Sequence, residues 1–231
     1  PMSNLTKKQK IIQEKHDPEK TYSLEEAMDI IQSVKSEKFD ESIDISVKLG
    51  VDPDKSDQNV RGAVTLPNSL GKEVKVAVFA DGDHASDAEA AGAEYVGMDD
   101  LAEKFQKDEV NVDVVISTNS AMKVVGKLGQ VLGPKGLMPN PKTGTVSDDV
   151  VTAIKNVKAG QVRFRTDKNG IIHGSIGKVS FEGNKIKANA SALLEELRKL
   201  KPASAKGVYI GNIALSSTMG PGVKINPGEL V

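Results

Sequence analysis

The stretch Val74-Lys-Val-Ala-Val-Phe-Ala80 decides how the middle of this chain folds. It is almost entirely apolar, as is typical of a strand that is covered on both faces of a parallel sheet. The residues after it lead into an alanine-rich helix around residues 84–91. Two further apolar segments, Tyr95-Val96 and residues 112–116, are predicted as strands of the same sheet. Strands that alternate with helices predict a small, parallel, doubly wound sheet.

Two more helices complete this α/β unit. Asp100-Leu-Ala-Glu103 has the pattern of a capping box, with apolar residues at helical spacing behind it. Ser147 is expected to cap a later helix, which Gly160 ends. We therefore predict a Rossmann-like, three-layer α/β domain over residues 67–158.

The first third of the chain has a different pattern. Ser23-Leu-Glu-Glu26 reads as a capping box, with apolar residues following at helical spacing. Residues 39–49 alternate between apolar and polar side chains, which predicts a half-buried strand. Residues 60–66 are expected to form another strand.

The last third returns to the pattern of the first. Strands are predicted at residues 161–165 and 171–176, on either side of Asp167-Lys-Asn-Gly170, whose Asn-Gly pair is a strong turn signal. A helix over residues 189–200 and a closing strand over residues 208–215 follow. Neither terminal third holds enough strands for a stable sheet of its own. We therefore expect residues 1–66 and 159–231 to form one split α+β domain, into which the α/β domain is inserted.

Composition indicates a soluble protein of the reducing cytoplasm. Hydrophobic residues make up 38% of the 231 residues and charged residues 27%. No apolar stretch approaches the ~20 residues of a membrane span, and no N-terminal apolar leader is visible. The chain has no cysteine, which excludes disulfides and thiolate metal sites.

Charge is segregated although the net charge is only −1. Residues 67–113 hold 4 Lys or Arg against 12 Asp or Glu, whereas residues 159–231 hold 11 against 5. Arg163 and Arg165 lie at period two, so they share one face of a predicted strand. A neutral total can therefore contain a basic surface for a polyanion, although a solvated strand face explains the same charges.

The loop Gly129–Gly144 holds four glycines, three prolines and two lysines, and no carboxylate or histidine. It cannot continue as helix or inner strand, so we predict a shaped, basic loop. From Gly136 to Thr143 it is a near miss to the phosphate loop G-x-x-x-x-G-K-[ST], because Pro141 replaces the second glycine. A rigid turn packed on its own domain and a ligand contact remain equally good readings.

No catalytic or metal site stands out. His16, His84 and His173 lack a second histidine at metal spacing, and no nucleophile motif is present. Asp81-Gly-Asp-His84 offers carboxylates to a cation, but helix N-termini favour the same residues. Ser216-Ser-Thr-Met-Gly-Pro-Gly222 joins hydroxyls, glycines and a methionine, a set that suits close contact with ribose and phosphate or an ordinary turn. We predict a protein that is not an enzyme and needs no cofactor or metal.

Several stretches resemble the L-one family of bacterial large-subunit ribosomal proteins, which form the mobile ribosomal stalk. They are Lys38-Phe-Asp-Glu-Ser-Ile-Asp44, Ser56-Asp-Gln-Asn-Val-Arg-Gly62, the Gly129–Gly144 loop, Gln161–Gly170 and Ser217–Gly222. The resemblance runs from about Leu5 to Gly228.

The resemblance implies a cytoplasmic, ribosome-bound protein with the two-domain fold described above. It implies that the split domain binds 23S ribosomal RNA in the large subunit, and that the protein represses translation by binding the leader of its own messenger RNA. It also implies a part in releasing deacylated transfer RNA from the exit site, no membrane contact, and a monomer when free.

The resemblance carries over a set of RNA-contacting residues at two strand ends. They are Lys38, Phe39, Glu41 and Ser42 at the first strand, and Asn212, Ser217, Thr218, Met219 and Gly220 at the last, with Lys168 and His173 added. Aromatic residues are only 3% of the chain, so shape, phosphate and 2′-hydroxyl contacts are expected to dominate over stacking. The alternatives are a nucleotide-dependent enzyme that uses Lys142 and a scaffold that binds other proteins.

Overall fold

The chain folds into two compact units in the computed structural model, which describes residues 7–35, 38–71, 73–107 and 109–229. One unit combines Pro1–Leu70 with Val162–Val231, and the other is Gly71–Gln161. The sequence placed the boundaries at residues 66/67 and 158/159, a few residues earlier at each crossing. Residues 1–6 lie outside the described part.

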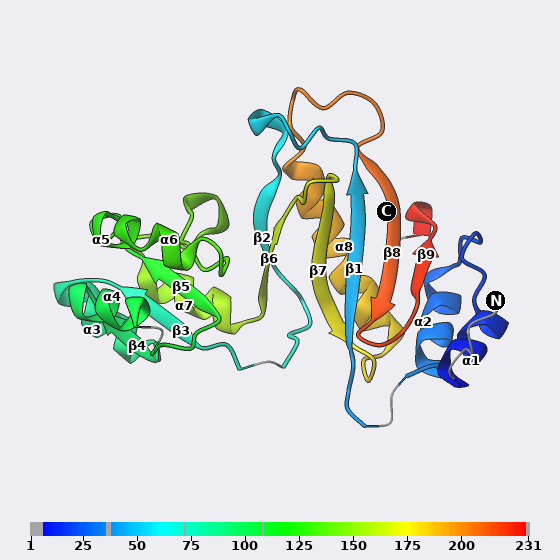
Figure 1. Ribbon diagram of the computed structural model, residues 1–231, viewed down its shortest axis with the longest axis horizontal. Coiled ribbons are helices and arrows are strands. Elements are labelled where there is room, and N and C mark those ends of the chain that lie inside the picture. The colour runs from blue at the N-terminus through cyan, green and yellow to red at the C-terminus, as the bar shows by residue number, and fades with distance from the viewer. Residues whose placement is uncertain (1–6, 36–37, 72, 108, 230–231) are drawn as a thin grey trace. The chain divides into compact units, whose positions relative to one another are not determined.

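The split unit is built on a four-stranded antiparallel sheet (Figure 1). Its spatial order is β7-β1-β8-β9, so β1 from the first third of the chain lies between two strands from the last third. The strands are β1 (Ser42–Leu49), β7 (Ile171–Lys178), β8 (Ile210–Ser217) and β9 (Gly222–Ile225). The first strand pairs only with strands from the far end of the sequence, which is why neither terminal third can form this sheet alone.

One face of this sheet is buried under two helices, α2 (Leu24–Ser33) and α8 (Gly183–Lys199). Ile43, Ile45 and Val47 of β1 are fully buried there. Burying each such side chain stabilises the fold by about 1.5–3 kcal/mol. The predicted alternation in β1 is therefore confirmed, and it fixes which side chains point away from the helices.

The helices of the split unit follow their predicted signals in part. Ser23 caps α2 with both bonds of the capping box, so that prediction is confirmed. Helix α8 begins at Gly183, earlier than the predicted residue 189. The prediction missed the first turns because they are polar and bury only Ile186. Helix α1 (Lys7–Lys15) precedes α2 and was not predicted.

The strands on either side of the Asp167–Gly170 turn do not form the regular pair that the turn signal suggested. Strand β6 (Gln161–Arg165) pairs with β2 (Arg61–Thr65) in a separate two-stranded sheet, whereas β7 joins β1. A single bridge, Thr166 to Ile172, links the two arms. The chain therefore changes sheets at this turn.

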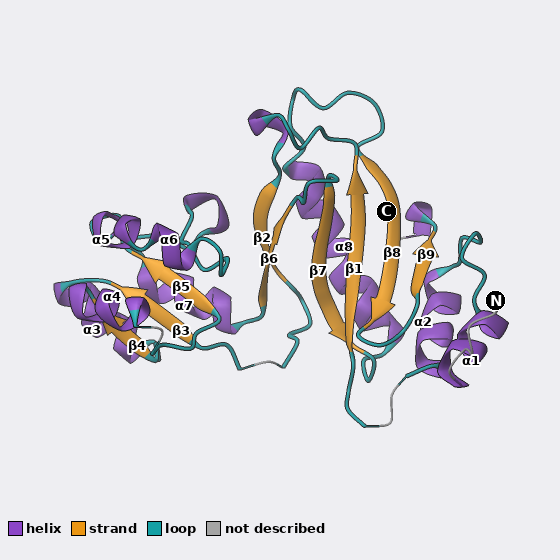
Figure 2. Ribbon diagram, in the orientation of Figure 1, coloured by secondary structure: helices purple, strands orange, loops and turns teal. Residues whose placement is uncertain are grey.

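The inserted unit is the predicted three-layer α/β domain. Its parallel sheet has the order β4-β3-β5 (Figure 2). One face packs on α4, α5 and α6, and the opposite face packs on α3 and α7. The strands are β3 (Val76–Phe79), β4 (Tyr95–Gly97) and β5 (Val114–Ser117), and the helices are α3 (Gly82–Ala90), α4 (Asp99–Gln106), α5 (Met122–Lys127), α6 (Gly129–Leu132) and α7 (Val150–Lys158).

Two predicted helix caps in this unit are wrong. Helix α4 already begins at Asp99, and its N-cap residue Met98 makes no capping bond, so residues 100–103 lie inside the helix. Helix α7 is capped by Asp149, whose carboxylate accepts from the Thr152 N–H at 3.1 Å. Ser147 instead accepts from the Asp149 N–H and shapes the approach to the helix.

The Gly129–Gly144 segment is partly helical, contrary to the predicted continuous loop. Its first four residues form α6, and Pro141–Thr143 form a 3₁₀ turn. The Lys142 N–H donates to the Asn140 side chain at 2.8 Å, and the Thr143 N–H donates to the Asn140 carbonyl at 3.1 Å. Backbone donors that a phosphate loop would turn toward its ligand are therefore used inside the segment.

Of the helices in the described part of the chain, none combines the length and apolar character that crossing a bilayer requires.

Candidate nucleic-acid interface

The face of the four-stranded sheet that points away from α2 and α8 carries polar side chains, and we call it the open face. In Figure 2, α8 lies behind this sheet, and no helix lies in front of the strands. Strand pairing places Ser46 between His173 of β7 and Ala214 of β8. The polar residues of the open face are Ser42, Asp44, Ser46, Lys48, His173, Ser175, Asn212, Ser216 and Lys224.

At one end of the open face, two segments far apart in the sequence meet. The Thr218 N–H donates to the Ser42 carbonyl at 3.1 Å, and the Ser42 N–H donates to the Thr218 hydroxyl at 3.1 Å. The predicted RNA-contacting residues before β1 and after β8 are thereby brought together. We call residues 38–42 and 217–220 the strand-end edge.

Two large side chains project from the strand-end edge. Phe39 is 50% exposed and Met219 is 59% exposed, although both are apolar. Lys38 is also exposed. An aromatic ring and a flexible thioether on the surface, beside a lysine, offer contacts to the faces of bases and ribose and to phosphate.

Two of the predicted contact residues point inward instead. Glu41 is 1% exposed and Ser217 is 4% exposed. The Glu41 carboxylate accepts from the Met219 N–H at 3.2 Å, and the Glu41 carbonyl accepts from the Val179 N–H at 2.9 Å. Glu41 therefore fixes the turn that exposes Met219. Ser217 is buried beneath that turn.

Gly220 is required by this packing. A Cβ added at Gly220 would lie 2.4 Å from the Ser217 hydroxyl oxygen. The Gly220 N–H donates to the Ser217 carbonyl at 3.1 Å, which closes the turn. The close approach of the two residues is therefore a structural reason for glycine at this position, whereas the RNA contact of Gly220 stays a prediction.

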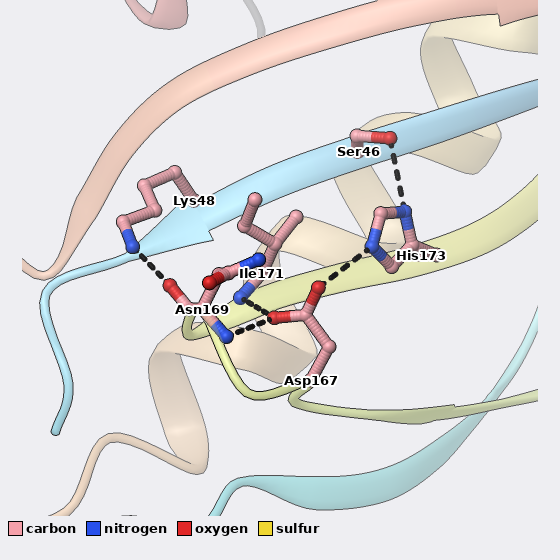
Figure 3. A network of polar contacts seen from close by, with 6 residues as sticks. All are labelled: Ser46, Lys48, Asp167, Asn169, Ile171 and His173. Carbon is pink, nitrogen blue, oxygen red and sulfur yellow. Dashed lines mark hydrogen bonds and ion pairs between the residues drawn. The ribbon is translucent and has the colours of Figure 1, made fainter. Parts of the chain in front are cut away.

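At the opposite end, a polar network surrounds the turn before β7 (Figure 3). The Asp167 carboxylate accepts from the Asn169 and Ile171 N–H groups, each at 2.8 Å. Its second oxygen lies 3.4 Å from Nε2 of His173, and the Lys48 ammonium donates to the Asn169 carbonyl. The turn is therefore tied to both β7 and β1.

His173 lies on the open face within this network. Its Nδ1 is 3.2 Å from the Ser46 hydroxyl, so β1 and β7 share one hydrogen-bonded group (Figure 3). The hydrogen bond from the Ile171 N–H is the main cause that holds the pKa of Asp167 below its ordinary value, with the Asn169 N–H and His173 adding to it. Lys168 is exposed at the tip of the turn.

Charges on the open face are few and mostly positive. Lys48 and Lys224 are exposed, and Asp44 is half-buried between them and the strand-end edge. Asn212 is exposed beside an irregularity in the pairing of β8 with β1. Hydroxyl and amide groups dominate, which suits recognition through ribose hydroxyls and phosphates.

Sequence reasoning omitted several residues of this face. Asp44, Ser46 and Lys48 alternate with the buried residues of β1, so the period-two pattern already placed them outward. Lys224 gave no such signal, because β9 was not predicted.

Comparison with known proteins places the chain in a family. Residues 31–221 match the model of the ribosomal protein L1p/L10e family. The large ribosomal subunit protein uL1 of Saccharophagus degradans is 58% identical over 99% of both chains. Proteins of the same name from Pseudoalteromonas atlantica and Pseudomonas paraeruginosa are 57% and 58% identical, over 99% of this chain and 98% and 99% of theirs. The chain therefore belongs to the ribosomal protein L1p/L10e family.

Proposed function

We propose that this protein is a non-enzymatic structural component of the large ribosomal subunit that binds 23S ribosomal RNA through the split unit. Family membership supports the ribosomal role. The observation that carries the RNA site is the strand-end edge, where Phe39 and Met219 are exposed above a turn fixed from within by Glu41.

The open face is better suited to bind a folded RNA than a flexible, unstructured polyanion. The open face offers hydroxyls on rigid strands, which can read ribose and phosphate positions without reading base sequence. Lys38, Lys48 and Lys168 add charge at both ends of the face. Binding is therefore expected to weaken as salt rises, because displaced counterions contribute to affinity.

Three more specific properties complete the proposal: translational repression, a part in transfer-RNA release, and a monomeric free state. We propose that a similar RNA fold in the protein's own messenger competes for the open face and represses translation. We also propose that the protein, bound at the stalk, assists the release of deacylated transfer RNA from the exit site, and that it is a monomer when free.

A nucleotide-dependent activity is less well supported. The backbone N–H groups around Lys142 donate within the Gly129–Gly144 segment. Lys142 is exposed, but a lysine without its phosphate cradle does not form a nucleotide site.

Filter binding of a 23S RNA fragment to the full chain tests the proposal. The double variant Phe39→Ala/Met219→Ala is expected to lose about 1–3 kcal/mol of binding free energy for each base contact removed. Val208→Ala is the matched control, because Val208 is 78% exposed and lies beyond the other end of β8. Equal losses in both variants would contradict the proposed surface.

A further inference from the structure

A pocket in the split unit lies away from the strand-end edge and has no part in the function described so far. Its volume is about 340 Å³, and it is lined by Arg198, Lys201, Tyr209, Ile210 and Pro227. These residues come from the end of α8, the start of β8 and the segment after β9. The pocket therefore forms where three elements of one unit meet.

The chemistry of the lining is that of an anion site. Arg198 and Lys201 place a guanidinium and an ammonium around the same space, and Lys201 Nζ lies 5.8 Å from the centre of the Tyr209 ring. Neither cation forms an ion pair with a carboxylate in the described part of the chain, whereas the neighbouring Lys199 pairs with Glu196 at 3.2 Å.

Tyr209 supplies a second and independent observation. Its side chain is only 7% exposed, and its buried hydroxyl has no hydrogen-bond partner among the described residues. A buried polar group without a partner costs about 1–3 kcal/mol, so such a group is rarely kept without a ligand or water to pair with it. Burial also raises the pKa of Tyr209 to about 12, so the phenol stays a donor at neutral pH.

The end of α8 offers a simpler reason for the two cations. Positive side chains in the last turn of a helix stabilise its negative end. That explanation accounts for Arg198, but it assigns no partner to the hydroxyl of Tyr209, which directly precedes β8. A ligand that accepts hydrogen bonds and carries negative charge accounts for all three groups.

We propose that this pocket binds a phosphate group, with Arg198 and Lys201 neutralising its charge. The Tyr209 hydroxyl, which is enclosed in this structure, would turn into the pocket on binding and donate to one of the phosphate oxygens. The volume exceeds that of an inorganic phosphate and leaves room for an attached sugar. If the phosphate belongs to the backbone of bound RNA, which rests on the proposed function, the pocket is a second anchor. Strand β8 would then separate it from the strand-end edge by about 23 Å.

Tyrosine NMR tests the pocket directly in the full chain. The sequence has only three tyrosines, Tyr22, Tyr95 and Tyr209, so ring-labelled protein gives a resolvable set of signals that Tyr209→Phe assigns. Inorganic phosphate is titrated first, and the 23S RNA fragment second. A saturable shift of the Tyr209 signal alone, with either ligand, is the expected result.

Variants that each remove one positive charge distinguish binding inside the pocket from general electrostatic attraction to the surface. Arg198→Gln and Lys201→Gln are each expected to weaken the response of Tyr209 about tenfold. Lys206→Gln is the control, because Lys206 is exposed in the same loop but does not line the pocket. A Tyr209 signal that moves with neither ligand, or an equal effect of Lys206→Gln, overturns the proposal.

The two ligands also distinguish the source of the phosphate from the proposed function. A shift with the RNA fragment but not with inorganic phosphate assigns the pocket to the RNA backbone. A shift with inorganic phosphate in a protein that does not bind the RNA fragment supports the pocket and refutes the proposed function. RNA binding that depends on Phe39 and Met219 while Tyr209 stays silent refutes the pocket alone.

Discussion

The Glu41 carboxylate accepts a hydrogen bond from the Met219 N–H at 3.2 Å, although 178 positions separate the two residues in the chain. Glu41 is 1% exposed and Met219 is 59% exposed, so a buried acidic group supports an exposed apolar one. The bond joins the start of β1 to the turn after β8. The strand-end edge therefore depends on contacts between the two halves of the split unit.

Replacing Glu41 tests this support. Glu41→Ala leaves the Met219 N–H without its acceptor, and we expect the free energy of unfolding to fall by about 1–3 kcal/mol. Affinity for the 23S RNA fragment should fall as well, because the turn is no longer fixed. Glu41→Gln keeps an acceptor oxygen and should retain most of both properties. Urea denaturation with identical midpoints for Glu41→Ala and the parent chain would show that the bond does not stabilise the fold.

The contact between Gly220 and Ser217 predicts that a second substitution restores the stability lost on replacing Gly220. Gly220→Ala should destabilise the protein by about 1–3 kcal/mol, because the new methyl group overlaps the Ser217 hydroxyl. Ser217→Ala should cost little, since that hydroxyl has no hydrogen-bond partner in the described part of the chain. The double variant should recover most of the lost stability, as measured by thermal unfolding. Losses that simply add would refute the overlap.

The buried hydrogen bonds of Asn189 are expected to contribute to the free energy of unfolding. Its side-chain amide donates to the Ile176 carbonyl at 2.7 Å and to the Asn68 carbonyl at 3.0 Å, and its oxygen accepts from the Asn68 N–H at 2.9 Å. Asn189→Ala leaves these groups unpaired and should lower the free energy of unfolding by about 1–3 kcal/mol. Asn184→Ala, exposed on the same helix, should change it by less than about 0.5 kcal/mol. Similar midpoints for both variants in urea would contradict the assignment.

The lowered pKa of Asp167 predicts that the stability of the fold decreases as the pH falls. Its pKa is lowered from 3.8 in the folded chain, chiefly by the Ile171 N–H bond. Its contribution to stability is therefore present above pH 3.8 and is lost as the pH falls through the lowered pKa. Asp167→Asn keeps an acceptor oxygen but cannot titrate, so between pH 5 and pH 3 it should lose less stability than the parent chain. Parallel unfolding curves for the two proteins across that range would refute the prediction.

The sequence was most informative where side-chain periodicity is strong. Alternation in residues 39–49 predicted β1, which begins at Ser42, and its buried face, and the apolar run at Val74–Ala80 predicted β3. Strand β9 escaped prediction because it has four residues and begins with Gly222 directly after a proline. The caps of α4 and α7 were misplaced because carboxylates or hydroxyls at neighbouring positions fit the same pattern.

The sequence predicted which residues lie at the candidate site, but not whether their side chains point outward or inward. The resemblance supplied residues at both strand ends, and the structure brings them together. It did not say that Ser217 points inward, because the strand was expected to end at residue 215 and in fact continues to Ser217. Nor did it show that Glu41 accepts a bond from a backbone group so distant in the sequence.

Crosslinking in whole ribosomes is the most direct test of RNA binding by the strand-end edge. A photoreactive residue is placed at Met219 in one protein and at Lys142, exposed in the inserted unit, in another. The account predicts that the probe at position 219 attaches to 23S ribosomal RNA, and that the probe at position 142 does so weakly or not at all. Attachment of 23S ribosomal RNA at position 142 with none at position 219 would contradict it.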